Sequence, residues 1–284
     1  MSSSGPRRTG ALAALGSLLV AALTLGFGGE AEPKPTVRVV KDVVYSVPEG
    51  GPLALDVYRP AEGWGYPSLL VIHGGAWKRG DKSDWRWAAR KLAKGGFAVF
   101  VANYRLAPPR GDAIYPTPVG DIRTAYAWIQ QNAPRYHGDP RSIGVVGSSA
   151  GGHLGLLMAA EMSGHPEAPR AVVGLSPPTD LSRLGTEGPL QRDVAAHLGC
   201  ELRDCPDTYA VASPVNRVQG SDPATFLAYS EDELIPLEHG VDMSDRLTEA
   251  GVPNRLMVVE GTAHGLRMGN IVLRKAIRFL RRRL

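Results

Sequence analysis

Two adjacent serines lie in a glycine-rich stretch, VVGSSAGGHLG, at residues 145–155. The pentapeptide GSSAG within it fits the pattern G-x-S-x-G and places Ser149 at its centre. In that pattern the chain turns sharply from a strand into a helix, and Gly147 and Gly151 avoid the clash that larger side chains would cause. The helix N-terminus behind the serine favours a developing oxyanion. If the stretch carries the nucleophile of an acyl transfer, the pattern therefore places it at Ser149 rather than at Ser148.

The same glycines could instead form a plain turn or a loop that binds phosphate. A nucleotide-binding loop follows G-x-x-x-x-G-K-[ST], and no lysine follows these glycines. The dinucleotide-binding spacing G-x-G-x-x-G is absent from this stretch as well. Because the pentapeptide alone does not separate a turn from a nucleophile, the choice between them depends on the other loops that follow predicted strands.

A base and an acid are available in two such loops. His264 follows a predicted strand near the C-terminus, and Asp232 follows the strand predicted at 225–230, with Glu231 and Glu233 as rivals for the same role. In acyl transfer a histidine takes the proton of the serine, and a carboxylate fixes the tautomer of that histidine and stabilises its charged form. We therefore predict His264 as the base and Asp232 as the acid.

A further loop could stabilise the negative oxygen that forms during acyl transfer. The segment HGGAW at 73–77 follows an apolar strand at 68–72, and its glycines allow the backbone to approach a ligand closely. An oxyanion hole needs two backbone N–H groups aimed at one point. We expect one from Ala150, directly after the nucleophile, and another from Gly75 or Ala76. His73 is interpreted as a residue that orders this loop.

Other histidines compete with His264 for the role of base. His153 lies in the helix predicted directly after Ser149, where it is expected to pack or cap rather than to reach the serine. The remaining histidines do not follow a predicted strand, and they are His137, His165, His197 and His239.

The elements that must position these residues alternate between strand and helix from residue 68 onward. Two β-rich segments precede them and predict an opening antiparallel pair. The alternation implies right-handed crossovers and a mainly parallel central sheet of about eight strands with helices on both faces, an α/β fold class whose reactive groups collect beyond the carboxyl ends of the strands. Strands are predicted at 37–47, 53–60, 68–72, 97–105, 142–148, 171–177, 225–230 and 254–259, and helices at 84–96, 119–133, 151–162, 241–251 and 271–282.

The N-terminus has the composition of an export signal. Residues 1–9 carry Arg7 and Arg8, residues 11–27 are apolar and uncharged, and a small-residue site for cleavage ends at Ala31. We expect a signal peptide at 1–31 and one catalytic domain at 32–284, with the less regular segment 178–223 as a cap- or lid-like insertion. An uncleaved membrane anchor and a core helix are the alternatives for the apolar segment. The expected location is periplasmic or secreted, with no membrane partner after cleavage.

Charge and cysteine content limit the partners of the chain. The formal net charge is +4, and its main basic cluster, at 274–283, fits the solvated face of a terminal helix better than a nucleic-acid surface. Cys200 and Cys205 are too few for a zinc site, which usually needs four ligands. In an exported protein they would close a small disulfide loop. The oligomeric state is not predicted.

Several motifs, taken in order, resemble one known family. The segments HGGAW, NYRLAP, GDIRTAYAWI, DPRSIGVVGSSAGGHLG, SPVN, EDELIP and GTAHG are similar to those of α/β-hydrolase esterases. The closest resemblance is to the acetylxylan and feruloyl esterase-like branch, next to the hormone-sensitive-lipase-like carboxylesterases. It implies a Ser149, Asp232 and His264 triad and an oxyanion role for the HGG loop. Two departures are Ala76 in place of a third glycine, and Tyr229-Ser230 where the family often has His-Gly.

The sequence thus predicts a secreted serine esterase that acts on short acyl esters, such as acetyl groups on plant polysaccharide. The expected partner is a small ester or an acylated carbohydrate, without a nucleic acid, metal or organic cofactor. Two alternatives stay open. The same triad could cleave an amide, formamide or peptide bond, or the fold could serve as a binding protein without catalysis.

Overall fold

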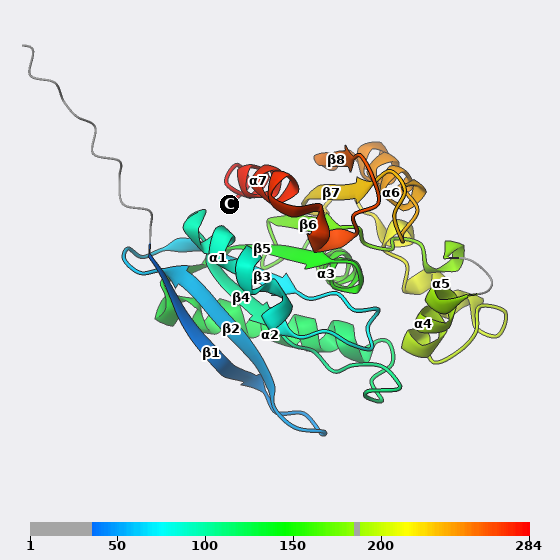
Figure 1. Ribbon diagram of the computed structural model, residues 1–284, viewed down its shortest axis with the longest axis horizontal. Coiled ribbons are helices and arrows are strands. Elements are labelled where there is room, and N and C mark those ends of the chain that lie inside the picture. Colours follow the sequence, from blue (N-terminus) through cyan, green and yellow to red (C-terminus); the bar gives the residue numbers. More distant parts are fainter. Residues whose placement is uncertain (1–35, 185–187) are drawn as a thin grey trace, which may run out of the picture. The chain divides into compact units, whose positions relative to one another are not determined.

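The computed structural model describes residues 36–184 and 188–284 (Figure 1). The signal peptide predicted at 1–31 lies outside the described residues. Within the described ranges, no helix combines the length and the apolar character needed to cross a membrane.

One eight-stranded sheet forms the centre of the molecule, in the order β1-β2-β4-β3-β5-β6-β7-β8. The pairs β1·β2 and β2·β4 are antiparallel, and every other neighbouring pair is parallel. This confirms the predicted fold class, including the opening antiparallel pair. The strands are β1 (Val37–Ser46), β2 (Leu53–Pro60), β3 (Tyr66–Ile72), β4 (Ala98–Ala102), β5 (Gly138–Ser148), β6 (Ala171–Leu175), β7 (Ala224–Ser230) and β8 (Asn254–Val259).

Strand β5 begins at Gly138, four residues before the start that its sequence predicts. Gly138 and Asp139 pair with the beginning of β3, and the register then shifts before Ile143. Pro140 lies within this irregular part of the strand. A proline disfavours a central strand except at its start or at a bulge, which explains why the sequence pattern pointed to a later beginning.

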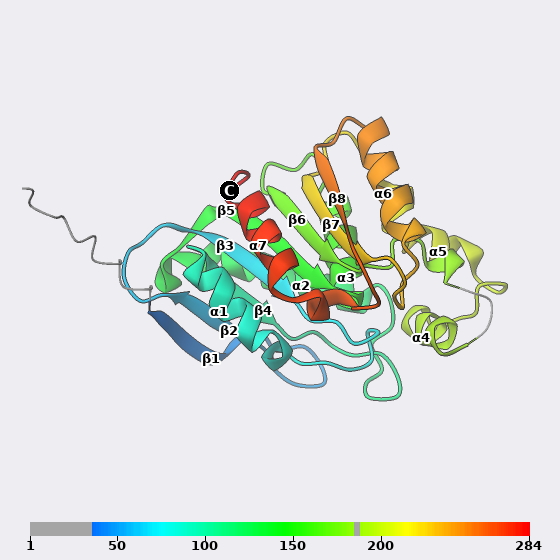
Figure 2. The same ribbon diagram turned by 45° about the horizontal axis from the view of Figure 1, so that its top comes forward.

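Helices cover both faces of the sheet (Figure 2). Helices α1 and α7 contribute to the core on one face, and α2, α3 and α6 contribute to the core on the other. Alternate residues of β3 point to opposite faces: Leu69 and Val71 belong to the first core, and Leu70 and Ile72 to the second. Burial on both faces is why this strand reads as a continuous apolar run. The helices are α1 (Arg86–Lys94), α2 (Thr117–Asn132), α3 (Ala150–Glu161), α6 (Glu238–Glu249) and α7 (Gly269–Leu280).

The segment between β6 and β7 contains two further helices, α4 (Pro189–Leu198) and α5 (Pro206–Val211). The sequence predicts a less regular segment here, without a helix, although residues 189–199 carry signals for one. Pro189 opens α4, where its missing N–H costs nothing, and Gly199 ends the helix in the left-handed conformation, with φ of 80°. A proline and a glycine ten residues apart therefore marked a helix within a segment of irregular composition.

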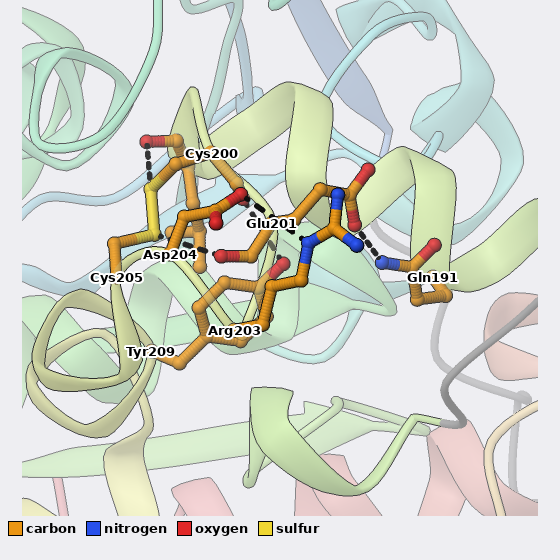
Figure 3. The surroundings of a disulfide bond; sticks show 8 residues. Gln191, Cys200, Glu201, Arg203, Asp204, Cys205 and Tyr209 are labelled. Atoms are coloured by element: carbon orange, nitrogen blue, oxygen red, sulfur yellow. Dashed lines mark hydrogen bonds and ion pairs between the residues drawn. A yellow bond between two sulfur atoms is a disulfide. The ribbon is translucent and has the colours of Figure 1, made fainter.

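A disulfide joins Cys200 to Cys205 in the loop between α4 and α5 (Figure 3). The two Cα atoms are 6.3 Å apart, within the usual range for a disulfide. The Tyr209 hydroxyl, from α5, donates a hydrogen bond of 3.2 Å to the carbonyl oxygen of Cys200. The disulfide loop is thus tied back to the helix that follows it.

Candidate active site

The candidate nucleophile lies at a sharp turn between strand and helix. Strand β5 ends at Ser148 and helix α3 begins at Ala150, so Ser149 occupies the turn alone. Its backbone has φ of 52° and ψ of −124°, a conformation that a residue with a Cβ rarely adopts. The Ser149 N–H donates a 2.8 Å hydrogen bond to the carbonyl oxygen of Leu175, at the end of β6. The neighbouring strand therefore holds the strained residue in place.

The two glycines of the motif are required by close backbone approach. A Cβ at Gly147 would lie 2.3 Å from the carbonyl oxygen of Gly151. A Cβ at Gly151 would lie 2.3 Å from the carbonyl oxygen of Ile72 in β3. Both distances are far below van der Waals contact, and backbone atoms cannot rotate away as a side chain can. The steric reason that the sequence predicts for these glycines is confirmed.

We expect Gly151→Ala to displace the turn that carries Ser149. The added methyl group must push the start of α3 away from β3, which should cost about 1–3 kcal/mol of unfolding free energy, as overpacking usually does. A shift of about 1 Å at the serine should lower kcat/KM by roughly 100-fold. Urea unfolding and ester hydrolysis measure the two effects.

Gly120→Ala is the matched control for this substitution. Gly120 lies inside α2, and a Cβ there meets no heavy atom within 4 Å. Alanine should therefore stabilise the helix by about 0.5–1 kcal/mol without changing hydrolysis. Equal activity in the two variants would show that Gly151 has no special steric role.

His264 pairs with Glu233, and not with the predicted Asp232. The Nδ1 atom of His264, in the loop after β8, forms a hydrogen bond with Oε2 of Glu233. The Glu233 side chain is fully buried, whereas 24% of the His264 side chain is exposed. Asp232 and Glu231 are exposed to solvent. Of the three neighbouring acids, the structure brings only Glu233 to the imidazole, which corrects the assignment made from the sequence.

Backbone hydrogen bonds of the loop after β7 explain this difference. The N–H of Glu231 donates to Val259 and that of Asp232 to Gly261, at 3.0 and 3.1 Å, so both residues follow the exit of β8. The chain then turns, and Oε1 of Glu233 accepts a 2.9 Å hydrogen bond from the N–H of Ser230. The Glu233 side chain therefore turns back toward the end of β7, and its other carboxylate oxygen reaches Nδ1 of His264.

Two serines connect this acid to the nucleophile turn through the loop of His264, and neither contact is predicted from the sequence. The hydroxyl of Ser176, directly after β6, donates to Oε1 of Glu233 at 2.6 Å and accepts from the N–H of Gly265 at 2.8 Å. The hydroxyl of Ser148 accepts from the N–H of Leu266 at 3.1 Å. The sequence predicts a strand at 171–177 that contains Ser176, whereas β6 ends at Leu175, so the rule that pointed to His264 did not single out this serine.

The HGGAW loop follows β3 and has an unusual backbone. Gly75, Ala76 and Trp77 have φ angles of 120°, 52° and 58°, all in the left-handed region. Only glycine fits the first position, because a Cβ there would lie 2.1 Å from the carbonyl oxygen of Arg79. The loop packs closely against the turn that carries Ser149. A Cβ at the preceding Gly74 would lie 3.2 Å from Cβ of Ser149.

His73, at the start of this loop, does not line the pocket that holds Ser149. Its Nδ1 lies 2.8 Å from the carbonyl oxygen of Gly74, and its ring stacks on Tyr104 with 4.4 Å between ring centres. Burial lowers the pKa of His73 below its usual value, so the ring is neutral near pH 7. These contacts agree with the interpretation of His73 as a residue that orders the loop.

The candidate residues meet at a pocket of about 870 Å³. Ser149, His264 and the three proposed oxyanion donors, Gly75, Ala76 and Ala150, all line it. The remaining wall combines charged side chains with apolar ones; the charged set is Lys78, Arg79, Asp81, Asp84, Arg110, Asp193 and Arg267, and the apolar set includes Trp77, Trp85, Pro178, Pro189, Leu190, Leu234, Ile235 and Leu266. Helix α4, in the segment between β6 and β7, thus contributes to this wall through Pro189, Leu190 and Asp193.

Comparisons with known proteins agree with this geometry. The BD-FAE family model matches residues 55–247. Esterase LipQ of Mycobacterium tuberculosis is 28% identical over 226 residues, which make up 74% of this chain and 53% of LipQ. An acetylxylan esterase of Xylanibacter ruminicola is 28% identical over 210 residues, 73% of this chain and 40% of that protein. The chain therefore spans about half the length, or less, of these curated relatives.

A solved structure described as a truncated form of carbohydrate esterase from gut microbiota superposes with a TM-score of 0.77. The alignment covers 89% of this chain and 98% of that one, at 22% identity, and so concerns the fold. The family match extends over more than half of the chain and contains the HGGAW loop, the nucleophile turn and Glu233. The chain belongs to the BD-FAE family and has the α/β-hydrolase fold of the esterases.

Proposed function

We propose that this protein is a serine carboxylic-ester hydrolase with Ser149 as its nucleophile. One observation carries the proposal: a serine on a strained turn, a histidine paired to a buried carboxylate and the loop expected to supply backbone N–H groups line the same pocket. These are the three functions that acyl transfer through a serine requires. The names of the esterase relatives support the same reaction class.

The proposed reaction follows from the position of each group. Glu233 accepts the Nδ1 proton of His264, which leaves Nε2 free to accept the proton of Ser149 as its oxygen attacks the ester carbonyl. The N–H of Ala150, with that of Gly75 or Ala76, stabilises the resulting oxyanion. His264 then donates its proton to the departing alcohol. A water molecule, activated by the same imidazole, releases the acid from the acyl-enzyme.

We further propose that the substrate is a short acyl ester, such as an acetyl group on a carbohydrate. The acetylxylan esterase among the relatives supports this choice. The charged side chains of the pocket wall offer hydrogen-bond partners to a polyhydroxylated alcohol. Export of the protein remains a proposal from the sequence, and it agrees with the disulfide, since such bonds persist in oxidising compartments.

Labelling with a fluorophosphonate probe tests the nucleophile directly. We expect wild-type protein to hydrolyse p-nitrophenyl acetate and to lose this activity as one probe is incorporated. Peptide mass spectrometry should place the label on Ser149. Modification of a different residue, or full hydrolysis after labelling, would contradict the proposal. Rates on acetylated xylan, simple esters and an aryl formamide, measured with the same preparation, then separate the substrate classes.

A further inference from the structure

Trp77 connects the oxyanion loop to the helix of the nucleophile. It follows Gly75 and Ala76 directly, and its side chain is 1% exposed. Its indole Nε1–H donates a 3.2 Å hydrogen bond to Nδ1 of His153, in helix α3 four residues after Ser149. The Nε2 atom of His153 lies 2.8 Å from the carbonyl oxygen of Ala212, at the end of α5.

These contacts allow only one protonation state of His153. A carbonyl oxygen can only accept, so Nε2 must carry the proton that is donated to Ala212. The indole N–H can only donate, so Nδ1 must be without a proton. Complete burial lowers the pKa of His153 to about 4, which keeps the ring neutral near pH 7 and compatible with both contacts. The imidazole therefore acts as a rigid connection between Trp77 and Ala212.

Helix α4 packs against one face of the indole. The ring of His197 stacks on Trp77, with 4.6 Å between ring centres and an angle of 5° between the planes. Neither ring nitrogen of His197 has a hydrogen-bond partner among the described residues, so its contribution here is packing. The same helix provides Asp193, which forms an ion pair with Lys78, the residue after Trp77.

The oxyanion loop needs such support because its own conformation is unfavourable. Ala76 and Trp77 both have positive φ angles, and residues with a Cβ keep this geometry only when their surroundings impose it. A local bond of 2.8 Å from the N–H of Lys78 to the carbonyl oxygen of Ala76 closes the turn. The indole is the large buried group at this end of the loop, so its position sets that of the preceding N–H groups.

We propose that His153 is a positioning residue that, through Trp77, holds the N–H groups of Gly75 and Ala76 where the oxyanion forms. This inference rests on the proposed esterase function. It assigns His153 a role in catalysis that differs from that of a base, because its ring bonds to Trp77 and Ala212 and does not line the pocket. It also gives the segment between β6 and β7 a part in shaping the oxyanion hole.

Two substitutions of His153 separate its two hydrogen bonds. Asparagine places an acceptor near the position of Nδ1 and can keep the contact with Trp77, whereas glutamine places a donor near Nε2 and keeps only the contact with Ala212. We expect His153→Gln to lower kcat by 10- to 100-fold with KM within about threefold, since the loss concerns an interaction of the transition state. His153→Asn should stay within about fivefold of wild type.

Trp77→Phe removes the indole N–H together with part of the ring that stacks on His197, so it should lower kcat at least as much as His153→Gln does. The double variant should lose no more than Trp77→Phe alone, because both substitutions break the same hydrogen bond. A trifluoromethyl ketone, which forms a hemiketal oxyanion with the serine, reports on the hole itself. Its inhibition constant should rise in parallel with the loss of kcat, an effect that lower stability alone does not produce.

His239→Gln is the matched control, because His239 is another buried histidine and bonds to Thr179 and Asp180 instead of the oxyanion loop. With rates corrected for the folded fraction by circular dichroism, its kcat and ketone inhibition should equal those of wild type. Unchanged kcat in His153→Gln, an equal loss in His153→Asn, or an equal loss in His239→Gln would overturn the proposal. A wild-type protein that neither hydrolyses esters nor binds the ketone would instead refute the esterase function.

Discussion

Replacing Ser149 with alanine is expected to lower kcat for p-nitrophenyl acetate by about 10⁴-fold or more. Without the hydroxyl no acyl-enzyme can form, and the histidine and the oxyanion donors retain only a small acceleration over water. The fold should persist, because alanine meets the same backbone demand at φ of 52° that serine meets, and the bond from the Ser149 N–H to Leu175 remains. Steady-state hydrolysis and circular dichroism measure the two effects.

Ser148→Ala is the matched control for this substitution. Ser148 is the neighbouring serine, and its hydroxyl accepts a hydrogen bond from the N–H of Leu266, in the loop of His264. Loss of this one bond should cost about 1 kcal/mol of stability and reduce kcat by less than 10-fold. Substantial turnover in Ser149→Ala, or an equal collapse in Ser148→Ala, would show that Ser149 is not the nucleophile.

Glu233→Gln is expected to lower kcat by roughly 10³- to 10⁴-fold, the second largest effect. The Oε1 position can still accept from Ser230 and Ser176, which leaves an amide N–H₂ facing Nδ1 of His264. Because this group donates, it favours an imidazole with its proton on Nε2, and that tautomer cannot accept the proton of Ser149. The fully buried carboxylate also stabilises the charged imidazole, and the amide cannot.

Asp232→Asn provides a direct contrast one residue away. Its side chain is exposed and has no hydrogen bond to His264 among the described residues, so the substitution should leave kcat within about threefold of wild type. Kinetics of both variants, with urea unfolding to compare their stability, decide between the two acids. If Asp232→Asn loses activity and Glu233→Gln does not, the acid predicted from the sequence is the correct one.

The sequence alone could not show whether Asp232 or Glu233 is the acid that pairs with His264. Residues 231–233 are all acidic, so composition and local pattern do not distinguish them. Their orientation depends on which groups each residue engages. Glu231 and Asp232 bond to Val259, at the end of β8, and to Gly261 just after it, about 30 residues later in the chain. Because both loops follow neighbouring strands, the sequence predicts that an acid lies near the histidine. Only the register between the loops after β7 and β8 decides which acid it is.

The contacts around Trp77 were likewise only partly predictable from the sequence. His153 is correctly predicted to be a packed residue, because its place in a helix behind the serine follows from the local pattern. Its partners could not be predicted, since Trp77, Ala212 and His197 come from three separate segments of the chain. Contacts of this kind depend on how the segment between β6 and β7 folds over the carboxyl ends of the strands.

The α/β architecture, the nucleophile turn and the loop of His264 all follow from the amino-acid sequence alone. Each of these depends on residues that are close together in the chain: apolar runs that end in glycine, a pentapeptide with two obligatory glycines, and a histidine in the loop after a strand. The tertiary structure alone decided that Glu233 pairs with His264, that Ser176 supports this acid, and that His153 and His197 hold Trp77. These are contacts between distant segments, and their geometry is set by backbone register and packing, which no local pattern records.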